Sequence, residues 1–151
     1  MANRRFITDG YREHSAADRN QSLVKLTAAP SPDGKLTFVA SSFRQQADDP
    51  QGLAWSAYQA APKSAAAAVL LYDTRKTIDQ QQGGLNYVHQ LGIHQVELAA
   101  YVGQRSVTQY QSIPRANQVG PANQRSPGGV IEFERNYAGA SGRVSSRFDL
   151  G

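Results

Sequence analysis

Two alternating segments around a tight turn constrain the fold most strongly. They are QSLVKLTAA and KLTFVASSF, which fill residues 21–43 together with the connecting PSPDG. In the second segment Leu36, Phe38 and Ala40 fall on one side of an extended chain. The Pro-Asp-Gly sequence at 32–34 suits a turn, because proline fixes φ and glycine accepts a positive φ. The pattern therefore predicts a β-hairpin over residues 21–43.

The region after the hairpin leaves two interpretations open. AWSAYQAA at 54–61 fits either a short helix or a strand. Residues 62–82 could form one helix that has proline at its first position. Alternatively, residues 67–73 form a buried strand, because VLLY favours a strand, and a helix starts directly afterwards with Asp73 or Thr74 as its N-cap. We prefer the second interpretation.

LNYVHQLG and the residues that follow it predict a helix and then a strand. Leu85, Val88 and Leu91 share one helical face, and Gly92 is a natural C-terminal stop. IHQVELAAYVG at 93–103 alternates instead, with a period of two. Such alternation favours a strand.

These elements predict an α+β fold in a chain of 151 residues. We expect a small, antiparallel-rich sheet with one or two helices and long extended N- and C-terminal arms. The expected sheet contains the hairpin at 21–43 and strands near 67–73 and 93–102. The expected units are an N-terminal arm at 1–20, a globular body at 21–103 and an extended, partner-ordered C-terminal arm at 104–151.

The chain offers few groups for catalysis or for metal binding. It has no cysteine, which excludes disulfides, thiolate zinc sites and cysteine nucleophiles. His89 and His94 are not spaced i, i+4 on one helix, as a helical ligand pair would be. No G-x-S-x-G or phosphate-binding glycine motif occurs. We therefore expect no catalytic, cofactor-binding or metal-binding residues, and no enzyme.

Charge and hydropathy bear on the partners. The formal net charge is +4, and arginine, which suits protein interfaces, supplies 12 of the 16 cations. Because the arginines are scattered, we expect the partners to be other protein subunits. Nucleic acid is a possible partner that the sequence favours less. The longest apolar run, AAAAVLLY at 65–72, is far short of the roughly 20 residues of a spanning helix. We expect no membrane span and a soluble, cytoplasmic or virion location.

The C-terminal third predicts contacts with a partner. SIPRANQVGPANQRSPGG at 112–129 holds three prolines and three glycines, which excludes a helix or a buried strand, and VIEFER at 130–135 is a strand candidate. Aromatic, aliphatic and arginine side chains are spaced along this segment, and such side chains are common anchors at interfaces. The predicted partner-binding residues are Tyr110, Ile113, Arg115, Arg125, Phe133, Arg135, Tyr137, Arg143, Arg147, Phe148 and Leu150.

One short segment has a family resemblance. VHQLGIHQVELA at 88–99 is similar to the helix–glycine–strand end of the small linker domain of phycobilisome linker polypeptides. The similarity covers about a dozen residues and carries over no functional residue, so it does not assign the chain to that family. The similarity does illustrate one kind of protein, a basic linker of an assembly, whose chemistry is compatible with this sequence.

The sequence as a whole favours a non-enzymatic structural or interaction subunit of a larger assembly. A virion accessory component and an antenna-type linker are both instances. In this hypothesis a small body docks into the assembly and the arms wrap its neighbours. The alternatives are a nucleic-acid-binding module, which would use the scattered arginines and aromatic residues, and an uncharacterised enzyme.

Overall fold

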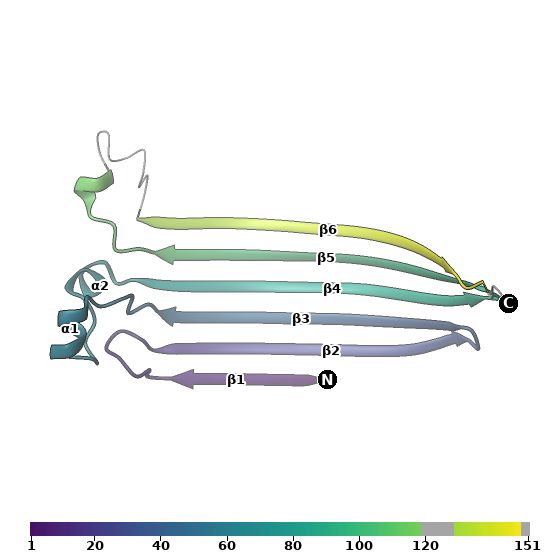
Figure 1. The fold of residues 1–151 in the computed structure, drawn as a ribbon, viewed down its shortest axis with the longest axis horizontal. Helices are drawn as coiled ribbons and strands as arrows, with labels where there is room; N and C mark the ends of the chain where they lie inside the picture. Colours follow the sequence, from purple (N-terminus) through teal and green to yellow (C-terminus); the bar gives the residue numbers. More distant parts are fainter. Residues whose placement is uncertain (119–128, 149–151) are drawn as a thin grey trace.

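A computed structural model describes residues 1–118 and 129–148, which form one antiparallel sheet of six strands in chain order (Figure 1). The strands are β1 (Ala2–Thr8), β2 (Ala17–Ser31), β3 (Gly34–Asp48), β4 (Arg75–Leu91), β5 (His94–Tyr110) and β6 (Val130–Ser146). The helices α1 (Trp55–Ala60) and α2 (Ala67–Tyr72) lie between β3 and β4, and the 3-10 helix η1 (Arg115–Gln118) follows β5.

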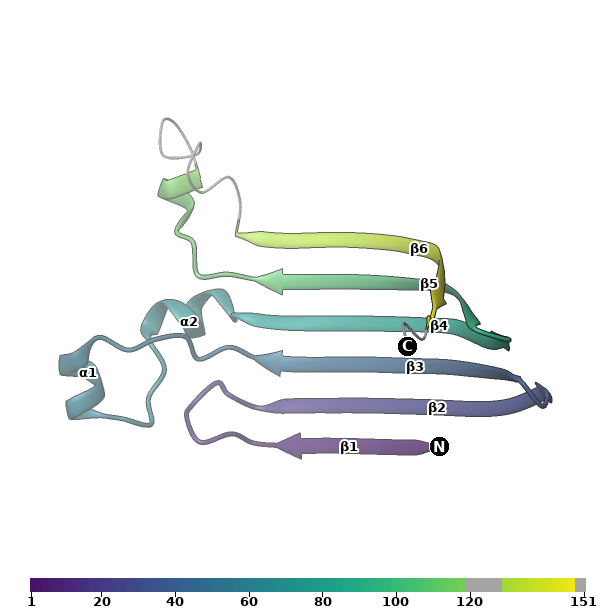
Figure 2. The same ribbon diagram turned by 45° about the vertical axis from the view of Figure 1, so that its right-hand side comes forward.

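The two ends of the sheet differ in their connections. At one end Pro32-Asp33 joins β2 to β3, and Gly92-Ile93 joins β4 to β5. Gly92 has a φ of 58°, which is easy only for glycine. At the other end the connections are long, and they carry both helices (Figure 2). We call the half of the sheet next to the two-residue turns the turn half. The half next to the long connections is the loop half.

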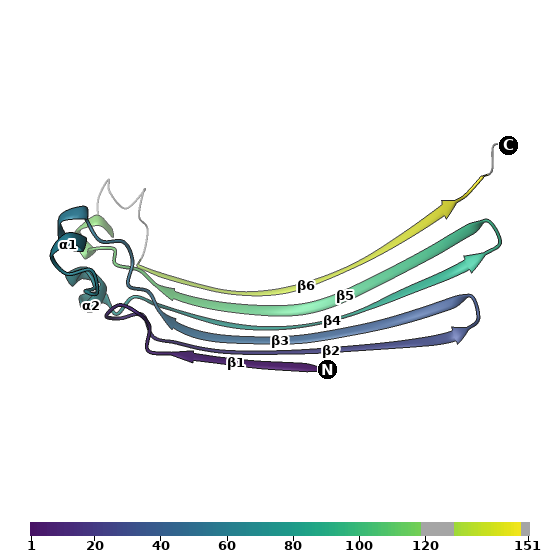
Figure 3. The same cartoon turned by 60° about the horizontal axis from the view of Figure 1, so that its bottom comes forward.

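The strands are unusually long for a globular domain. Strands β2 and β3 have 15 residues each, and β4, β5 and β6 have 17, whereas strands of about 5–6 residues are most common. At about 3.4 Å per residue, 17 residues extend for about 55 Å. The long strands bend together along their length (Figure 3).

Strand pairing assigns each side chain to one of two faces. Leu26, Phe38 and Leu85 are successive cross-strand partners on β2, β3 and β4, so they share a face that we call face A. Arg105 and Arg135 are partners on β5 and β6 and lie on the opposite side, face B. Because successive residues alternate between the faces, these pairings assign every strand residue to face A or to face B.

The described sheet is a single layer with a very small core. Val69, Ile78 and Val107 are its buried hydrophobic residues within the described part of the chain. The accessible surface is 10979 Å² for 16.4 kDa. A compact monomer of this mass exposes only about 7,500 Å². About 3,500 Å² of surface that a second layer would ordinarily cover therefore remains exposed.

The structure confirms the predicted hairpin and the predicted strand at 93–102. Strands β2 and β3 pair across the turn over most of their length, and β5 contains residues 93–102 apart from Ile93. The α+β class is supported only in part, because the sheet dominates and both helices have six residues.

Three predictions between residues 67 and 92 are wrong. Residues 67–72 form helix α2 rather than a strand. No helix starts at Asp73 or Thr74, and LNYVHQLG is not a helix, because β4 occupies Arg75–Leu91. Pairing with β3 on one side and β5 on the other satisfies the backbone groups of this segment, and that pairing outweighs its helical spacing. The helix–glycine–strand similarity at 88–99 is lost for the same reason.

The segments expected to be arms contribute strands. Strand β1 and the start of β2 come from residues 1–20. The end of β5 and all of β6 come from residues 104–151. Strand β6 pairs with β5 along its whole length, so the same chain holds its backbone in place. The arm boundaries and ordering by a partner stay predictions.

Candidate functional site

A broad apolar surface covers the turn half of face A, and we call it the apolar band. Its large side chains are exposed, with Leu98 at 51% and Val102 at 63% of their full surface. No charged residue interrupts it on the strands. The residues of the band are Val24, Leu26, Ala28, Leu36, Phe38, Ala40, Leu85, Tyr87, Val96, Leu98, Ala100, Val102, Ala138, Ala140 and Val144.

Face B is polar in the same half of the sheet. Asn86 donates a hydrogen bond to Glu97 Oε1 at 2.9 Å, and Arg143 pairs with Glu97 Oε2 at 2.9 Å. These three residues lie side by side on β4, β5 and β6. Lys25 and Lys35 are on the same face. The turn half therefore has one apolar side and one polar side.

In the loop half of face A the strands carry charges of both signs. Arg5 pairs with Asp18 at 3.0 Å, and Arg44 pairs with Asp79 at 2.7 Å. The hydrogen bond and the charge of Asp18 raise the pKa of Arg5, so this guanidinium stays charged. At the strand end Arg75 pairs with the Asp73 carboxylate at 2.6 Å. The apolar band thus ends where charged pairs begin.

Face B of the loop half is cationic, and its arginines are held by neutral groups. Arg19 donates to Gln45 Oε1 at 3.1 Å, and Arg105 donates to Gln80 Oε1 at 3.1 Å. Arg105 Nε is buried and has no hydrogen-bond partner. The cations on these strands are Arg4, Arg19, Lys76, Arg105 and Arg135.

Tyr137 organises the centre of this face. Its hydroxyl donates to Gln82 Oε1 at 2.9 Å and accepts from Gln80 Nε2 at 3.3 Å. The ring lies directly over Gly103, where a Cβ atom would meet the hydroxyl oxygen of Tyr137 at 2.5 Å. Glycine is therefore required at this position for the ring to lie flat on the sheet. Gln80, which Tyr137 positions, in turn orients Arg105.

At the loop end Arg12 joins two connections of the chain. Its guanidinium donates to the carbonyl oxygens of Gln51 at 2.6 Å, Pro50 at 3.2 Å and Ser64 at 2.9 Å. The β1–β2 and β3–β4 connections are thereby held together. Three backbone carbonyls bound to one partly buried guanidinium make Arg12 the central residue of this cluster.

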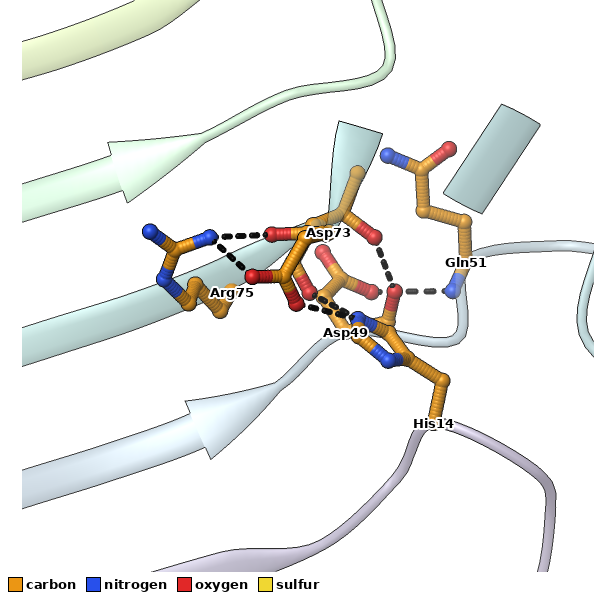
Figure 4. A network of polar contacts seen from close by, with 6 residues as sticks. His14, Asp49, Gln51, Asp73 and Arg75 are labelled. Carbon is orange, nitrogen blue, oxygen red and sulfur yellow. Dashed lines mark hydrogen bonds and ion pairs between the residues drawn. The ribbon is translucent and has the colours of Figure 1, made fainter. Parts of the chain in front are cut away.

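His14, Asp49 and Asp73 continue the cluster (Figure 4). His14 Nε2 donates to the Thr74 carbonyl at 2.7 Å and lies 3.7 Å from Asp73 Oδ1. The buried Thr74 hydroxyl donates to the carbonyl of Asp49 at 2.7 Å. His14, Gln51 and Asp73 all have left-handed backbone conformations. These contacts fix the loops, but they assemble no nucleophile–base pair.

Both edges of the sheet are open. Strand β1 pairs with residues 17–23 of β2, so residues 24–31 have no strand beside them on that edge within the described chain. On the opposite edge β6 likewise has no described neighbour beyond β5. Long open edges are ready-made pairing sites for further strands.

No family model matches the chain. A solved structure does resemble it. The crystal structure of the ferric citrate transporter FecA in the unliganded form is similar with a TM-score of 0.69 and 22% sequence identity. The match covers 93% of this chain and 19% of the FecA chain. At this identity the likeness shows the fold alone, and this chain spans only about a fifth of that protein's length.

The predicted partner-binding residues that the structure describes lie on β6, at the end of β5, or directly after these two strands. Phe133, Arg135, Tyr137 and Arg143 all lie on face B of β6. At the loop end Tyr110 stacks under Arg75, with the guanidinium carbon 3.7 Å from the ring centroid. Ile113 and Arg115 follow β5, while Arg147 and Phe148 follow β6. Arg125 and Leu150 lie outside the described residues.

Within the described residues, no group of three or more His, Cys, Asp or Glu side chains is placed to hold a metal ion. Neither described helix is long and apolar enough to cross a membrane.

Sequence reasoning missed Arg12, Arg105 and the apolar band. Arg12 has no local signal, because its partners are about 40 and 50 residues away. The band had a signal in the alternation of β3 and β5, but it becomes a surface only when the register of all the strands is known.

Proposed function

We propose that this chain forms part of the wall of a membrane-embedded transporter and has no enzymatic activity. In this proposal the apolar band faces lipid acyl chains and face B lines a polar interior. The observation that carries the proposal is the apolar band itself, a continuous apolar surface on face A of the turn half that no charged strand residue interrupts.

The apolar band follows the strands for most of the length that a bilayer requires. From Val96 to Val102 the band follows β5 for about 20 Å, and on β4 it continues from Leu85 towards Leu91. Sheets that span membranes carry an outward apolar band about 25 Å tall, with alternate side chains facing a polar interior. Lys25, Asn86 and Glu97 are such alternate side chains on face B.

The arrangement of connections supports the same proposal. Strands of membrane-spanning sheets are joined by short turns at one end and longer loops at the other. Here the apolar band lies beside the two-residue turns, and the charged pairs of face A, including Arg44–Asp79, lie beside the long loops. The loop half would then project beyond the bilayer into water.

The open edges require neighbours. In a bilayer, unpaired backbone N–H and C=O groups cost several kcal/mol each, so edge strands must be covered. Residues 24–31 and strand β6 would therefore pair with further strands of the same wall. The exposed surface beyond that of a compact monomer supports such a larger structure.

The transporter role comes from the similarity in fold to FecA, which is a ferric citrate transporter. We extend transport of a small solute to this chain as part of the proposal. A virion accessory component, an antenna-type linker and a nucleic-acid-binding module stay alternative proposals. Each of these would need protein or nucleic acid, rather than lipid, to cover the apolar band.

Cysteine labelling tests the proposal, because the chain has no cysteine of its own. Leu98 and Ala99 are neighbours on opposite faces of β5. We expect Leu98→Cys, in membranes of cells that express the protein, to react with a lipid-soluble maleimide and to resist a membrane-impermeant one. Ala99→Cys is the matched control and is expected to react with the water-soluble reagent once the membrane is permeabilised.

Equal labelling of the two cysteines by the water-soluble reagent in permeabilised membranes would reject the proposal. Recovery of the chain entirely in the soluble fraction would reject it as well. Either result would favour the alternatives in which protein subunits cover the apolar band.

A further inference from the structure

The charges of the strands are divided between the two faces. Face B carries cations with Glu97 as the one acid among its strand residues, whereas face A carries Asp18, Asp48, Asp79, Glu132 and Glu134. The cations of face B are Arg4, Arg19, Lys25, Lys35, Lys76, Arg105, Arg135 and Arg143. The modest net charge of the chain conceals this asymmetry.

The two faces also differ in how their arginines are compensated. Arg5 and Arg44 on face A each contact a carboxylate at 3.0 Å or less. On face B Arg143 has Glu97, but that pair lies in the turn half. In the loop half of face B no cation has a carboxylate partner among residues 1–118 and 129–148. Glutamine oxygens hold Arg19 and Arg105 instead, and they leave the positive charge in place.

Arg105 and Arg135 concentrate this charge at one point. They are direct cross-strand partners on β5 and β6. Like charges in this position are about 5 Å apart at their Cβ atoms and destabilise strand pairing. Gln80 and Tyr137 nevertheless hold the Arg105 guanidinium in place, and Arg105 Nε still lacks a partner. An anion between the two arginines would remove the repulsion.

We propose that the loop half of face B binds a small solute with carboxylate or phosphate groups, and that Arg105 and Arg135 are its primary contacts. The planar guanidinium fork suits both groups, because it can donate two parallel hydrogen bonds to their oxygens. Tyr137 and Gln80 are positioning residues that hold Arg105. This inference deepens the proposed function, on which it rests for the route of the solute.

A small solute fits this surface better than a macromolecule does. Arg105 Nε has almost no accessible surface, so a partner for it must enter the network of Gln80 and Tyr137. An oxygen of a small anion can enter there, whereas a broad macromolecular surface contacts only the exposed side chains. If the chain bound a polynucleotide with an affinity that falls steeply as salt is added, and bound no small anion, nucleic acid would be the supported partner instead.

Titration of the full chain in neutral detergent micelles with inorganic phosphate, and separately with succinate, tests the proposal. We expect the ¹⁵N resonance of Arg105 Nε to shift with at least one of them. The two titrations show whether the site prefers phosphate or carboxylate. Arg135→Gln should weaken binding by about tenfold, since charge-assisted hydrogen bonds are lost. Arg44→Gln, which removes the same charge from face A, should change it by less than about twofold.

Absence of a shift with both anions at about 10 mM, a concentration that covers weak sites, would overturn the proposal. So would equal weakening by Arg135→Gln and Arg44→Gln.

A second measurement uses membranes without purification. Phosphate or succinate should protect Arg135, and not Arg44, from modification by phenylglyoxal, and equal modification of both would count against the site. Neither measurement depends on cysteine labelling, so the two proposals can fail separately.

Discussion

Replacement of Gly103 by alanine tests the packing that positions the cationic face. The new Cβ would lie 2.5 Å from the hydroxyl oxygen and 2.7 Å from Cε2 of Tyr137, whereas carbon atoms at optimal contact are about 3.5–4.0 Å apart. The ring must therefore move by about 1 Å. Its hydrogen bonds to Gln80 and Gln82 are then lost. Overpacking of this kind costs about 1–3 kcal/mol, and the two partly exposed hydrogen bonds add about 1 kcal/mol.

Urea unfolding of the chain in detergent micelles, followed by circular dichroism, measures this effect. Gly83→Ala is the matched control, because its Cβ would meet nothing closer than 3.8 Å. Alanine there should be neutral or stabilise by up to about 1 kcal/mol. Tyr137→Ala should rescue Gly103→Ala in a double-mutant cycle. Equal stability of Gly103→Ala and Gly83→Ala would refute the reasoning, since the ring would then not lie on Gly103.

Two further predictions concern the loop cluster and the apolar band. Arg12→Ala should speed amide exchange in residues 9–16 and 49–74 and leave the strands protected, because Arg12 alone holds three carbonyls of these loops together. Unchanged exchange in the loops would contradict that role. Leu85→Arg should destabilise the membrane-inserted chain by about 2–4 kcal/mol. Asn86→Arg, on face B, should have a much smaller effect in the same unfolding assay, and equal effects would argue against a lipid-facing band.

The sequence was sufficient to predict a strand where local signals and tertiary pairing agree. The hairpin at 21–43 has two alternating segments and a proline–glycine turn, and both signals act within a few residues. The strand at 93–102 has the same period-2 alternation. These segments fold as their own pattern predicts, because no longer-range contact contradicts it.

The errors arise where two periods fit the same residues. Leu85, Val88 and Leu91 match a helical face, but Leu85, Tyr87 and Leu91 also share face A of a strand. Strand pairing over the 17 residues of β4 decides the outcome. Residues 67–72 show the reverse case, since VLLY has a strand-like composition but the preceding alanines favour a helix.

The candidate site was hidden for a different reason. A helix that spans a membrane is visible in a sequence as one continuous apolar segment, whereas the apolar band consists of alternate residues on five strands. Likewise Arg105 and Arg135 are 30 residues apart in sequence and become neighbours only through the β5–β6 register. Arg135 and Tyr137 were predicted as contact residues, but the face that they share with Arg105 could not be predicted.

Fluorescence quenching by lipid tests the central claim most directly. In a Trp55→Phe background, a single tryptophan is placed at Leu98 or at Ala99, and the protein is reconstituted in vesicles with brominated acyl chains. The account predicts strong quenching of the tryptophan at 98 and weak quenching at 99. Equal, weak quenching at both positions would show that lipid does not cover the apolar band, and would contradict the account.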